Sequence, residues 1–390
     1  MKLVSLPISV ILVNLAVTTI SATQAQATLI VSNSEGNNLV LFDENTGSFQ
    51  GNFTTSINGG LRDPDDLTFG LDGNLYVSVG GSSGGNLLDP SYPTDSAVLR
   101  YSPTGEFLGV AAAGNGLTRP YGNAFSPDGI LYVSSFRTNQ ILKFDPTTGN
   151  FLGVFASDNN DGLGTPNGLN GPNDLLFGTD GSLYVTTQGS ANLPNGDLAF
   201  PYESQVLRYS PAQVAGQEPT TNPTIFIPQP IPSPESSGFV SFLGLILAPN
   251  NDILVSDFAG SIRRYNPTGV LVDTLSTNYT GTIPSSNFIG NLTFGTGSSS
   301  NNLYVAGFDF TNQNIGSVLA YNGATGDSTS FSGTQFTNSS LVRSIGITAI
   351  PESVPEPDFN FMFSLLAFSP FFMTVARKRH SQNNFKRVSK

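Results

Sequence analysis

The sequence predicts an all-β chain folded as a six-bladed β-propeller with four-stranded antiparallel blades. Three observations predict it. A short phrase recurs along the chain, and the turn formers, 42 Gly and 26 Pro among 390 residues, are spread evenly. No long stretch has the 3.6-residue period of an amphipathic helix. Short strands that repeat in groups of four are typical of propeller blades.

The recurring phrase is a pair of strands joined by a tight turn. Its clear copies span residues 66–78, 123–134 and 174–186, each with an Asp-Gly turn followed by Leu-Tyr-Val. Looser copies span residues 245–256 and 291–306. Asp-Gly between runs of β-branched and aromatic residues predicts a β-hairpin.

A second phrase supplies two more strands. Runs such as Val-Leu-Arg-Tyr follow each hairpin, at residues 98–101, 141–144, 206–209, 262–265 and 318–321. Turns of the form Pro-Thr-Gly come next in several units, and a further strand, such as residues 107–110 or 151–154, completes the unit. Each unit therefore predicts one four-stranded blade.

The two ends of the repeat array predict how the ring closes. The first unit has strands at residues 29–31 and 39–42 but nothing ahead of them to serve as an innermost strand. Residues 344–349 match that missing strand. Six blades closed by strands from both ends leave no exposed edge at the join, so we expect six, with seven as the alternative.

The phrase Phe-x-x-Asp-Gly-x-Leu-Tyr-Val, as in residues 69–77, resembles the repeats of NHL-repeat and gluconolactonase-like six-bladed propellers. The resemblance covers residues 29–350. It implies the fold and, for the gluconolactonase-like enzymes, a divalent ion held by one Glu, two Asn and one Asp. Asp65 and Asn173 occupy two of the matching positions, whereas Tyr121, Leu243 and Gly290 occupy others.

The N-terminal segment predicts export. Lys2 precedes an apolar stretch, and Ala25-Gln26-Ala27 has the small-x-small form of a signal peptidase site. We expect residues 1–27 to be a signal peptide cleaved after Ala27 by the export machinery. A retained membrane anchor is the alternative.

The C-terminal segment, residues 351–390, predicts sorting. Val354 to Pro357 contain the motif Pro355-Glu356-Pro357, an apolar helix is expected over residues 358–376, and a basic tail follows at 377–390. Such a helix with positive charge behind it is typical of a membrane-spanning stop-transfer segment. The pattern resembles the PEP-CTERM signal, which implies an exosortase-type processing enzyme and a place at the cell envelope, outer surface or extracellular matrix. An unprocessed anchor is the alternative.

Charge and composition exclude several classes of function. Between residues 28 and 357 the chain has nine Lys or Arg against 27 Asp or Glu, a formal charge of −18. Such a charge repels phosphate backbones, so we expect no nucleic acid partner. The chain has no Cys, and its one histidine, His380, lies in the basic tail. Thiol chemistry and catalysis by a core histidine are therefore excluded, and no catalytic residue is assigned.

Three long loops predict the functional face. Residues 80–97 and 188–205 join second to third strands, and residues 156–172 join two blades. In a propeller these connections emerge opposite the Asp-Gly turns, and long loops on one face usually carry binding. Residues that lead into the innermost strands come to the channel mouth on that face: Arg62, Asp65, Arg119, Tyr121, Asn123, Asn173, Asn291 and Arg343.

Oxygen-bearing side chains near this mouth are candidate ligands for Ca²⁺ or another divalent cation. They are Asp65, Asp66, Asn173, Asp174 and Asp257. Aromatic residues in the long loops, Tyr92, Phe200 and Tyr202, are candidates for stacking on sugar rings or for covering the sheet below.

The sequence thus predicts an exported binding protein whose ligand is an extracellular polysaccharide or a surface protein, taken on the long-loop face. The alternative is a divalent-metal-dependent hydrolase of the lactonase type that uses Asp65, Asn173 and a neighbouring carboxylate.

Overall fold

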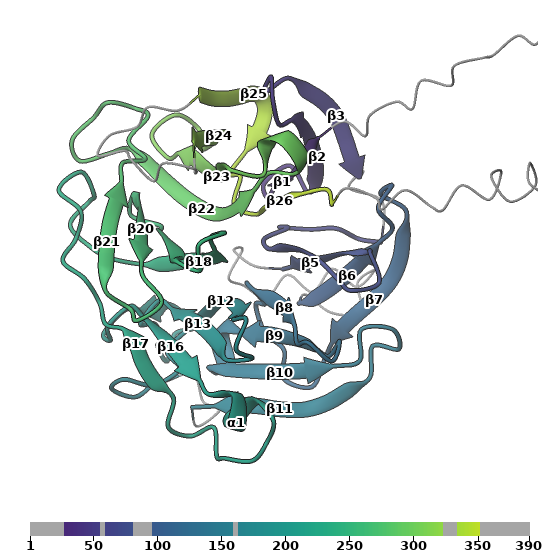
Figure 1. The fold of residues 1–390 in the computed structure, drawn as a ribbon, viewed down its shortest axis with the longest axis vertical. Helices are drawn as coiled ribbons and strands as arrows, with labels where there is room; N and C mark the ends of the chain where they lie inside the picture. Colours follow the sequence, from purple (N-terminus) through teal and green to yellow (C-terminus); the bar gives the residue numbers. More distant parts are fainter. Residues whose placement is uncertain (1–26, 55–58, 81–95, 159–162, 323–333, 352–390) are drawn as a thin grey trace, which may run out of the picture. The chain divides into compact units, whose positions relative to one another are not determined.

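Six four-stranded antiparallel sheets stand radially around a common axis in the computed structural model (Figure 1). The structure describes residues 27–54, 59–80, 96–158, 163–322 and 334–351. By its contacts the chain divides into Met1–Pro351 and Glu352–Lys390, and every described residue belongs to the first unit. The fold and the blade count that the sequence predicts are confirmed.

The blades are numbered in chain order, and each is given from its innermost to its outermost strand. Blade 1 is β26 (Ile347–Ala349), β1 (Thr28–Asn33), β2 (Asn38–Asp43) and β3 (Phe49–Thr54). Blade 2 is β4 (Leu67–Phe69), β5 (Leu75–Val79), β6 (Ala97–Tyr101) and β7 (Phe107–Ala113). Blade 3 is β8 (Asn123–Phe125), β9 (Leu131–Ser135), β10 (Gln140–Phe144) and β11 (Phe151–Ser157).

The second half of the ring repeats this order. Blade 4 is β12 (Pro172–Phe177), β13 (Leu183–Thr187), β16 (Gln205–Tyr209) and β17 (Thr224–Ile227). Blade 5 is β18 (Phe242–Leu247), β19 (Ile253–Asp257), β20 (Ser261–Tyr265) and β21 (Leu271–Leu275). Blade 6 is β22 (Asn287–Phe294), β23 (Asn302–Asp309), β24 (Ile315–Asn322) and β25 (Thr334–Val342).

Turn chemistry sets the inner hairpin of each blade. Gly73, in the Asp-Gly turn between β4 and β5, has φ 75°, which a residue without a Cβ adopts at no steric cost. The Asp72 carboxylate accepts the backbone N–H of Asn74 at 3.1 Å and so holds the turn. In blade 5 Asn251 takes the same left-handed position (φ 67°), because asparagine tolerates this conformation better than most residues.

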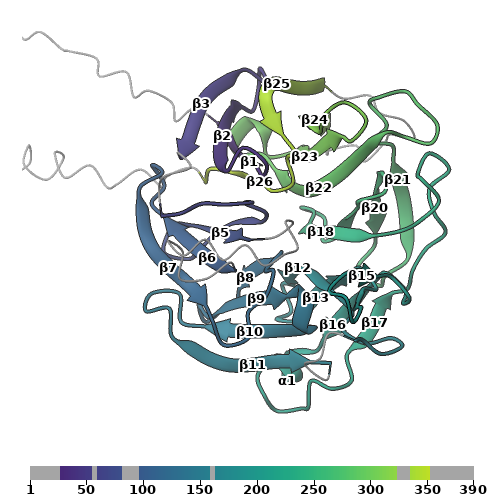
Figure 2. The same ribbon diagram turned by 180° about the vertical axis from the view of Figure 1, so that it is seen from behind.

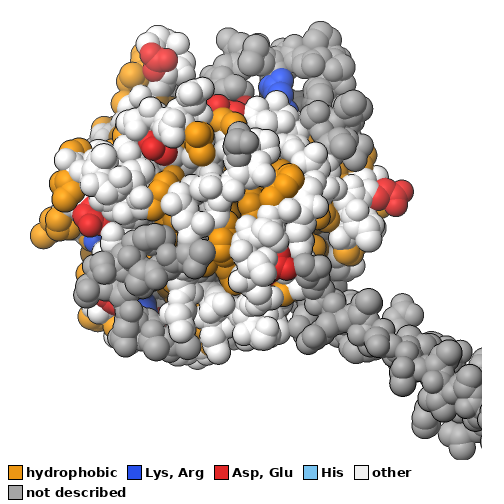
Figure 3. Space-filling model, turned by 90° about the horizontal axis from the view of Figure 1, so that it is seen from above, with side chains coloured by type: hydrophobic (Ala, Val, Ile, Leu, Met, Phe, Trp, Pro, Cys, Tyr) orange, Lys and Arg blue, Asp and Glu red, His pale blue; other side chains and the backbone are white. Residues whose placement is uncertain are grey.

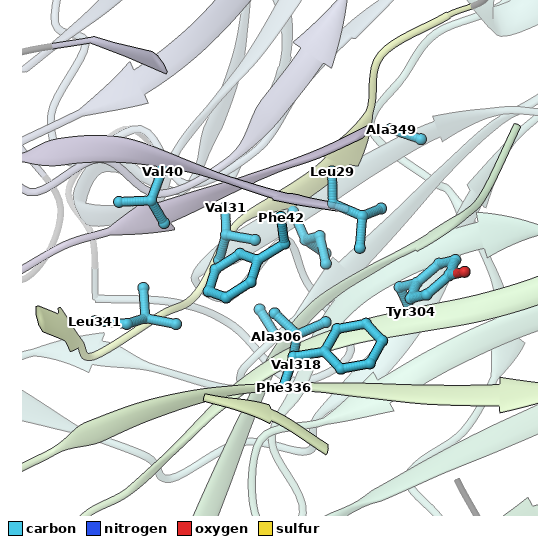
Figure 4. Packing of buried hydrophobic residues seen from close by; sticks show 11 residues of the cluster. Leu29, Val31, Val40, Phe42, Tyr304, Ala306, Val318, Phe336, Leu341 and Ala349 are labelled. Carbon is cyan, nitrogen blue, oxygen red and sulfur yellow. The ribbon is translucent and has the colours of Figure 1, made fainter. Parts of the chain in front are cut away.

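The ring closes as the sequence predicts. The C-terminal strand β26 pairs antiparallel with β1, with Leu29 opposite Ala349 and Val31 opposite Ile347. Figure 4 shows the apolar cluster between this blade and blade 6, where Phe42 lies close to Val318 and Phe336. Burial of this cluster ties the two chain ends of the propeller together.

The remaining elements are short. A hairpin of β14 (Ala191–Asn192) and β15 (Leu198–Ala199) forms within the loop between β13 and β16, and Figure 2 shows β15 on the side of the ring nearer the viewer. Helix α1 (Pro211–Val214) follows β16, and its first turn is capped by the Ser210 side chain. Two single 3₁₀ turns cover Phe136–Thr138 and Gly297–Ser299.

Apolar side chains remain exposed on the outer strands. Leu152 and Val154 of β11 and Leu271 and Val272 of β21 are each between 45% and 53% exposed. Figure 3, which views the ring from its side, shows such apolar side chains among uncharged polar surface, with few charged groups.

The predicted targeting segments lie outside the described residues, except Ala27 and Pro351 at their edges. This holds for Ala25, for the Pro355-Glu356-Pro357 motif and for the expected helix at residues 358–376. Within the described ranges, no helix is long and apolar enough to cross a membrane. Export, processing and membrane insertion therefore stay predictions.

Candidate functional site

The residues that lead into the six innermost strands form two layers around the axis. The pairing of each innermost strand with the second strand of its blade aligns the six blades with one another. In this alignment each blade contributes one residue to each layer. The first, here the mouth layer, is Asp65, Tyr121, Asn173, Leu243, Gly290 and Ile345. The second, here the neck layer, is Asp66, Gly122, Asp174, Gly244, Asn291 and Gly346.

A cavity of about 640 Å³, here the mouth cavity, opens above the mouth layer. Four of the six mouth-layer residues line it, together with Arg119 and Arg343, which come two residues before Tyr121 and Ile345. The loop that carries β14 and β15 (Figure 2) contributes one wall, so the cavity opens on the long-loop face. The wall residues from that loop are Gln188, Leu198, Phe200 and Tyr202.

Aromatic rings make up much of the remaining lining. Phe136 follows β9, Phe258 follows β19, and Phe239 precedes β18. Phe200 is 59% exposed and Phe239 40% exposed, so both rings present a face to whatever enters. A concave site of a few hundred Å³ with apolar walls and few polar groups is typical of small-molecule sites.

Two arginines and one carboxyl group supply the charge in this cavity. The Arg119 guanidinium carbon lies 5.0 Å from the centroid of the Tyr121 ring and 5.3 Å from that of Phe136. The Arg343 guanidinium carbon lies 6.0 Å from the Phe308 ring. Both arginines have left-handed backbones, φ 57° and 54°, a conformation that arginine seldom adopts.

Asp65 is the carboxyl group of the mouth cavity, and only 8% of it is exposed. Burial raises the pKa of Asp65 to about 7, because the charged form loses its hydration. Arg343 and Arg119 oppose this shift, and Asp66 and Asp63 add to it by repulsion. Asp65 therefore changes charge near neutral pH, and it does so between two permanent cations.

The neck layer alternates polar residues with glycines, and each glycine meets the next blade. A Cβ on Gly122 would collide with the carbonyl oxygen of Asn173, and one on Gly346 with the carbonyl oxygen of Asp65. A Cβ on Gly244 would lie 2.9 Å from the side-chain oxygen of Asn291. The glycines thus allow the backbones of adjacent blades to come together beneath the cavity.

The polar members of the neck layer bond between blades. Asp66 accepts the Asn123 backbone N–H at 2.9 Å and the Asn291 amide at 2.8 Å. Asp174 accepts the Leu245 N–H at 2.7 Å. Burial raises the pKa of both carboxyl groups, that of Asp66 to about 6, and repulsion from Asp66 raises the pKa of Asp174 further. The polar side chains of the neck layer therefore link adjacent blades through hydrogen bonds. The two carboxyl groups of this layer also bind protons more tightly than exposed carboxylates do.

Hydroxyl groups on the second strands fix the bend above this layer. The Ser134 hydroxyl accepts the N–H of Gly122 at 2.8 Å, and Thr186 accepts that of Asp174 at 2.9 Å. Ser256 and Ser32 accept the corresponding N–H groups in blades 5 and 1. This hydroxyl follows Leu-Tyr-Val in blades 3 and 4 and a similar apolar triplet in blades 5 and 1, so the sequence carries a signal for its role.

The structure divides the predicted mouth residues. Asp65, Arg119, Tyr121 and Arg343 share the mouth cavity, whereas Arg62 is not among its lining residues. Asn291 belongs to the neck layer, and Asn123 directly follows Gly122 of that layer. Both asparagines line a second cavity of about 360 Å³ on the opposite face. Asn173 is 3% exposed, and its side-chain nitrogen has no hydrogen-bond partner.

The candidate metal ligands fall in different places. Asp65 lines the mouth cavity, and Asp66 and Asp174 line the cavity on the opposite face. Asp257 is fully buried and pairs with Arg263 at 3.3 Å. Across the described residues, no three Asp, Glu, His or Cys side chains gather closely enough to hold a metal ion. The calcium site and the lactonase mechanism stay predictions.

Sequence reasoning missed several lining residues. Phe136 and Phe258 each follow a second strand directly, so the repeat aligns them with each other, whereas Phe239 lies in a segment without a motif. Ile345 reads as an ordinary strand residue, and Leu243 was considered only through the family resemblance. The alignment of Leu243 and Ile345 with Asp65 in the repeat was the signal that could have placed both at the mouth.

Comparison with known proteins bears on the fold. No protein-family model matches the chain, and no curated protein matches it. A chain of a nidogen/laminin complex is similar at 14% identity and TM-score 0.54, over 83% of this chain and 98% of that one. A Bacteroides caccae protein of unknown function is similar at 12% identity and TM-score 0.51, over 84% and 99%.

A gluconolactonase from Xanthomonas campestris aligns at 14% identity and TM-score 0.46, over 72% of this chain and 79% of that one. Likeness at such low identity reports the fold and leaves the chemistry of the site open. With the six sheets described above, the comparisons show that this chain is a six-bladed β-propeller.

Proposed function

We propose that this chain is an exported surface or extracellular-matrix protein that binds a saccharide, part of an extracellular polysaccharide, in the mouth cavity. One observation carries the proposal. The cavity of about 640 Å³ on the long-loop face is walled by aromatic rings from separate segments, with a small set of polar groups between them.

The size and lining of the cavity favour a saccharide over a surface protein. A protein partner needs about 800 Å² of surface on each side, most of it open and gently contoured. A concave volume of this size instead suits one or two sugar rings or the end of a chain. The exposed faces of Phe200 and Phe239 suit the C–H face of a sugar, and Gln188, Gln229 and Ser241 offer partners for its hydroxyls.

Export and placement at the cell envelope belong to the same proposal. They rest on the sequence of residues 1–27 and 351–390, and the formal charge of −18 between residues 28 and 357 suits a soluble protein outside the cell. Before processing, the apolar stretch at residues 358–376 would hold the chain in the membrane.

Equilibrium binding of the purified protein to a panel of neutral and acidic polysaccharides tests this proposal. We expect at least one to be retained, and we expect Phe200→Ala to weaken that binding about tenfold, because a ring that packs on the ligand is lost. Leu152→Ala, which removes a comparably exposed apolar side chain from β11, is the matched control. Retention of no polysaccharide, or equal loss in the two variants, would refute the proposal.

A further inference from the structure

We propose that the saccharide held in the mouth cavity is acidic, and that Arg119 and Arg343 bind the carboxylate of a hexuronate residue. This inference rests on the proposed function, since it names the class of ligand for the same cavity. Three independent features of the two arginines support it.

The first feature is that, among the described residues, neither guanidinium group takes part in a hydrogen bond or an ion pair. Arg208, Arg263 and Arg264 form ion pairs, whereas no carboxylate of the described residues lies within ion-pair distance of Arg119 or Arg343. The Arg119 Nε is buried and has no hydrogen-bond partner. A buried charged donor without an acceptor is costly, and an anionic ligand in the cavity would satisfy it.

The second feature is the way aromatic rings hold the guanidinium groups. Arg119 lies over the rings of Tyr121 and Phe136, and Arg343 over that of Phe308. Each guanidinium group thus lies near aromatic rings, and both arginines line the mouth cavity. The planar edge of a guanidinium matches a carboxylate with two parallel hydrogen bonds.

The third feature is the strained backbone at both positions. Blade 4 has Gly171 (φ 62°) where blade 3 has Arg119 and blade 1 has Arg343. Glycine makes this left-handed bend without strain, whereas an arginine strains it and brings a charged side chain to the cavity. At the same position blade 2 has Asp63 (φ 41°), which does not line the mouth cavity, whereas Arg119 and Arg343 both line it.

Asp65 makes the preference for an anion depend on pH. At low pH its carboxyl group is protonated and can donate a hydrogen bond to the ligand carboxylate, and with its pKa raised to about 7 it becomes a repelling anion above neutrality. The other groups that act on Asp65 are Arg119, Arg343, Asp63 and Asp66. Binding of a hexuronate should therefore be strongest between pH 5 and 6.5 and should weaken above about pH 7.

The test compares a galacturonic acid trisaccharide with its methyl ester, which keeps the shape of the sugar and removes the charge. We expect the full-length protein to bind the acid at least tenfold more tightly than the ester at pH 6. Arg119→Gln and Arg343→Gln should each weaken binding of the acid about tenfold or more and weaken binding of the ester much less. Arg208→Gln, which makes the same change of charge on β16 away from the cavity, should bind like the native chain.

Asp65→Asn gives a second readout that does not depend on the arginine variants folding. The neutral amide still donates a hydrogen bond, so this variant should bind the acid at pH 6 and should lose the decline in affinity between pH 6 and 8. Equal binding of acid and ester by the native chain would overturn the inference and leave saccharide binding intact. Failure of every saccharide, acidic or neutral, to bind would overturn the proposed function itself.

Discussion

Asp65 and its neighbour Asp66 show how strongly the fold can separate the environments of two adjacent residues. The Asp65 side chain lines the mouth cavity, while that of Asp66 lines the cavity on the opposite face. Burial keeps the pKa of both above the usual value for aspartate. The folded chain therefore binds protons near neutral pH that the unfolded chain has already released.

We predict that the free energy of unfolding falls as pH rises from about 4 to 7. The unfolded Asp65 releases its proton near pH 4 and the folded one near pH 7, so the contribution is fully present below pH 4 and lost above pH 7. Each unit of raised pKa contributes about 1.4 kcal/mol to this change. Urea unfolding at several pH values measures it.

Asp65→Asn should reduce this loss of stability and should unfold at a higher urea concentration than the native chain at pH 8. Asp197→Asn, at an exposed turn of the β14–β15 hairpin, should leave the pH profile unaltered. Parallel profiles for the native chain and Asp65→Asn would contradict the prediction. Asp66 and Asp174 retain their own contributions in this variant, so the profile should flatten in part.

At the scale of elements, the bend before the innermost strand in blades 1, 3, 4 and 5 depends on a hydroxyl from the second strand. Ser134 accepts the N–H of Gly122 at 2.8 Å and that of Tyr121 at 3.3 Å. Blade 6 has Ala306 at this position, and there the N–H of Asn291 donates to the carbonyl of Ile345 instead. A blade without the hydroxyl thus needs another acceptor for the same buried donor.

We predict that Ser134→Ala lowers the free energy of unfolding by ~1–3 kcal/mol, because it leaves buried N–H groups without an acceptor. Ser134→Thr should cost less, since Thr186 makes the equivalent bond in blade 4. Chemical denaturation of the three chains provides the measurement. Equal stability of the alanine and threonine variants would show that the hydroxyl is not the acceptor that matters.

At the scale of the whole molecule, closure joins the two ends of the propeller through side-chain packing as well as strand pairing. Ile347 of β26 is 3% exposed and packs in the cluster that spans blades 1 and 6. Because the ring has one such join, loss of packing there weakens the contact that holds both ends of the array.

Ile347→Ala should therefore lower the free energy of unfolding by ~2–5 kcal/mol, the range for emptying a buried aliphatic site. Ile231→Ala, at a position 86% exposed, is the control and should change it by less than about 0.5 kcal/mol. Thermal or urea unfolding of the full chain distinguishes them. A similar small effect from both substitutions would mean that β26 contributes little to closure.

Much of the fold could be predicted because each blade repeats local signals. The turn at Gly73 and the Leu-Tyr-Val strands depend on neighbours a few residues away, and the match of residues 344–349 to an innermost strand follows from the repeat. The site was predicted in part, because Asp65, Arg119, Tyr121 and Arg343 precede innermost strands and share one cavity. The aromatic walls were predicted in part, because Phe200 and Tyr202 lie in a long loop. Phe136 and Phe258 share a repeat position directly after a second strand, and Phe239 lies in a segment that no repeat aligns.

The sequence by itself determined the all-β class, the four-stranded unit, the number of blades and the closing strand, because turn chemistry and strand periodicity act over short distances. Only the tertiary structure decided that Asp66, next to Asp65 in the chain, bonds to Asn291 in the neck layer and lines the cavity on the opposite face. It also decided that aromatic rings from separate blades enclose the cavity that Asp65, Arg119 and Arg343 share. These outcomes depend on how six blades pack around one axis, and burial there sets the charge of each carboxyl group.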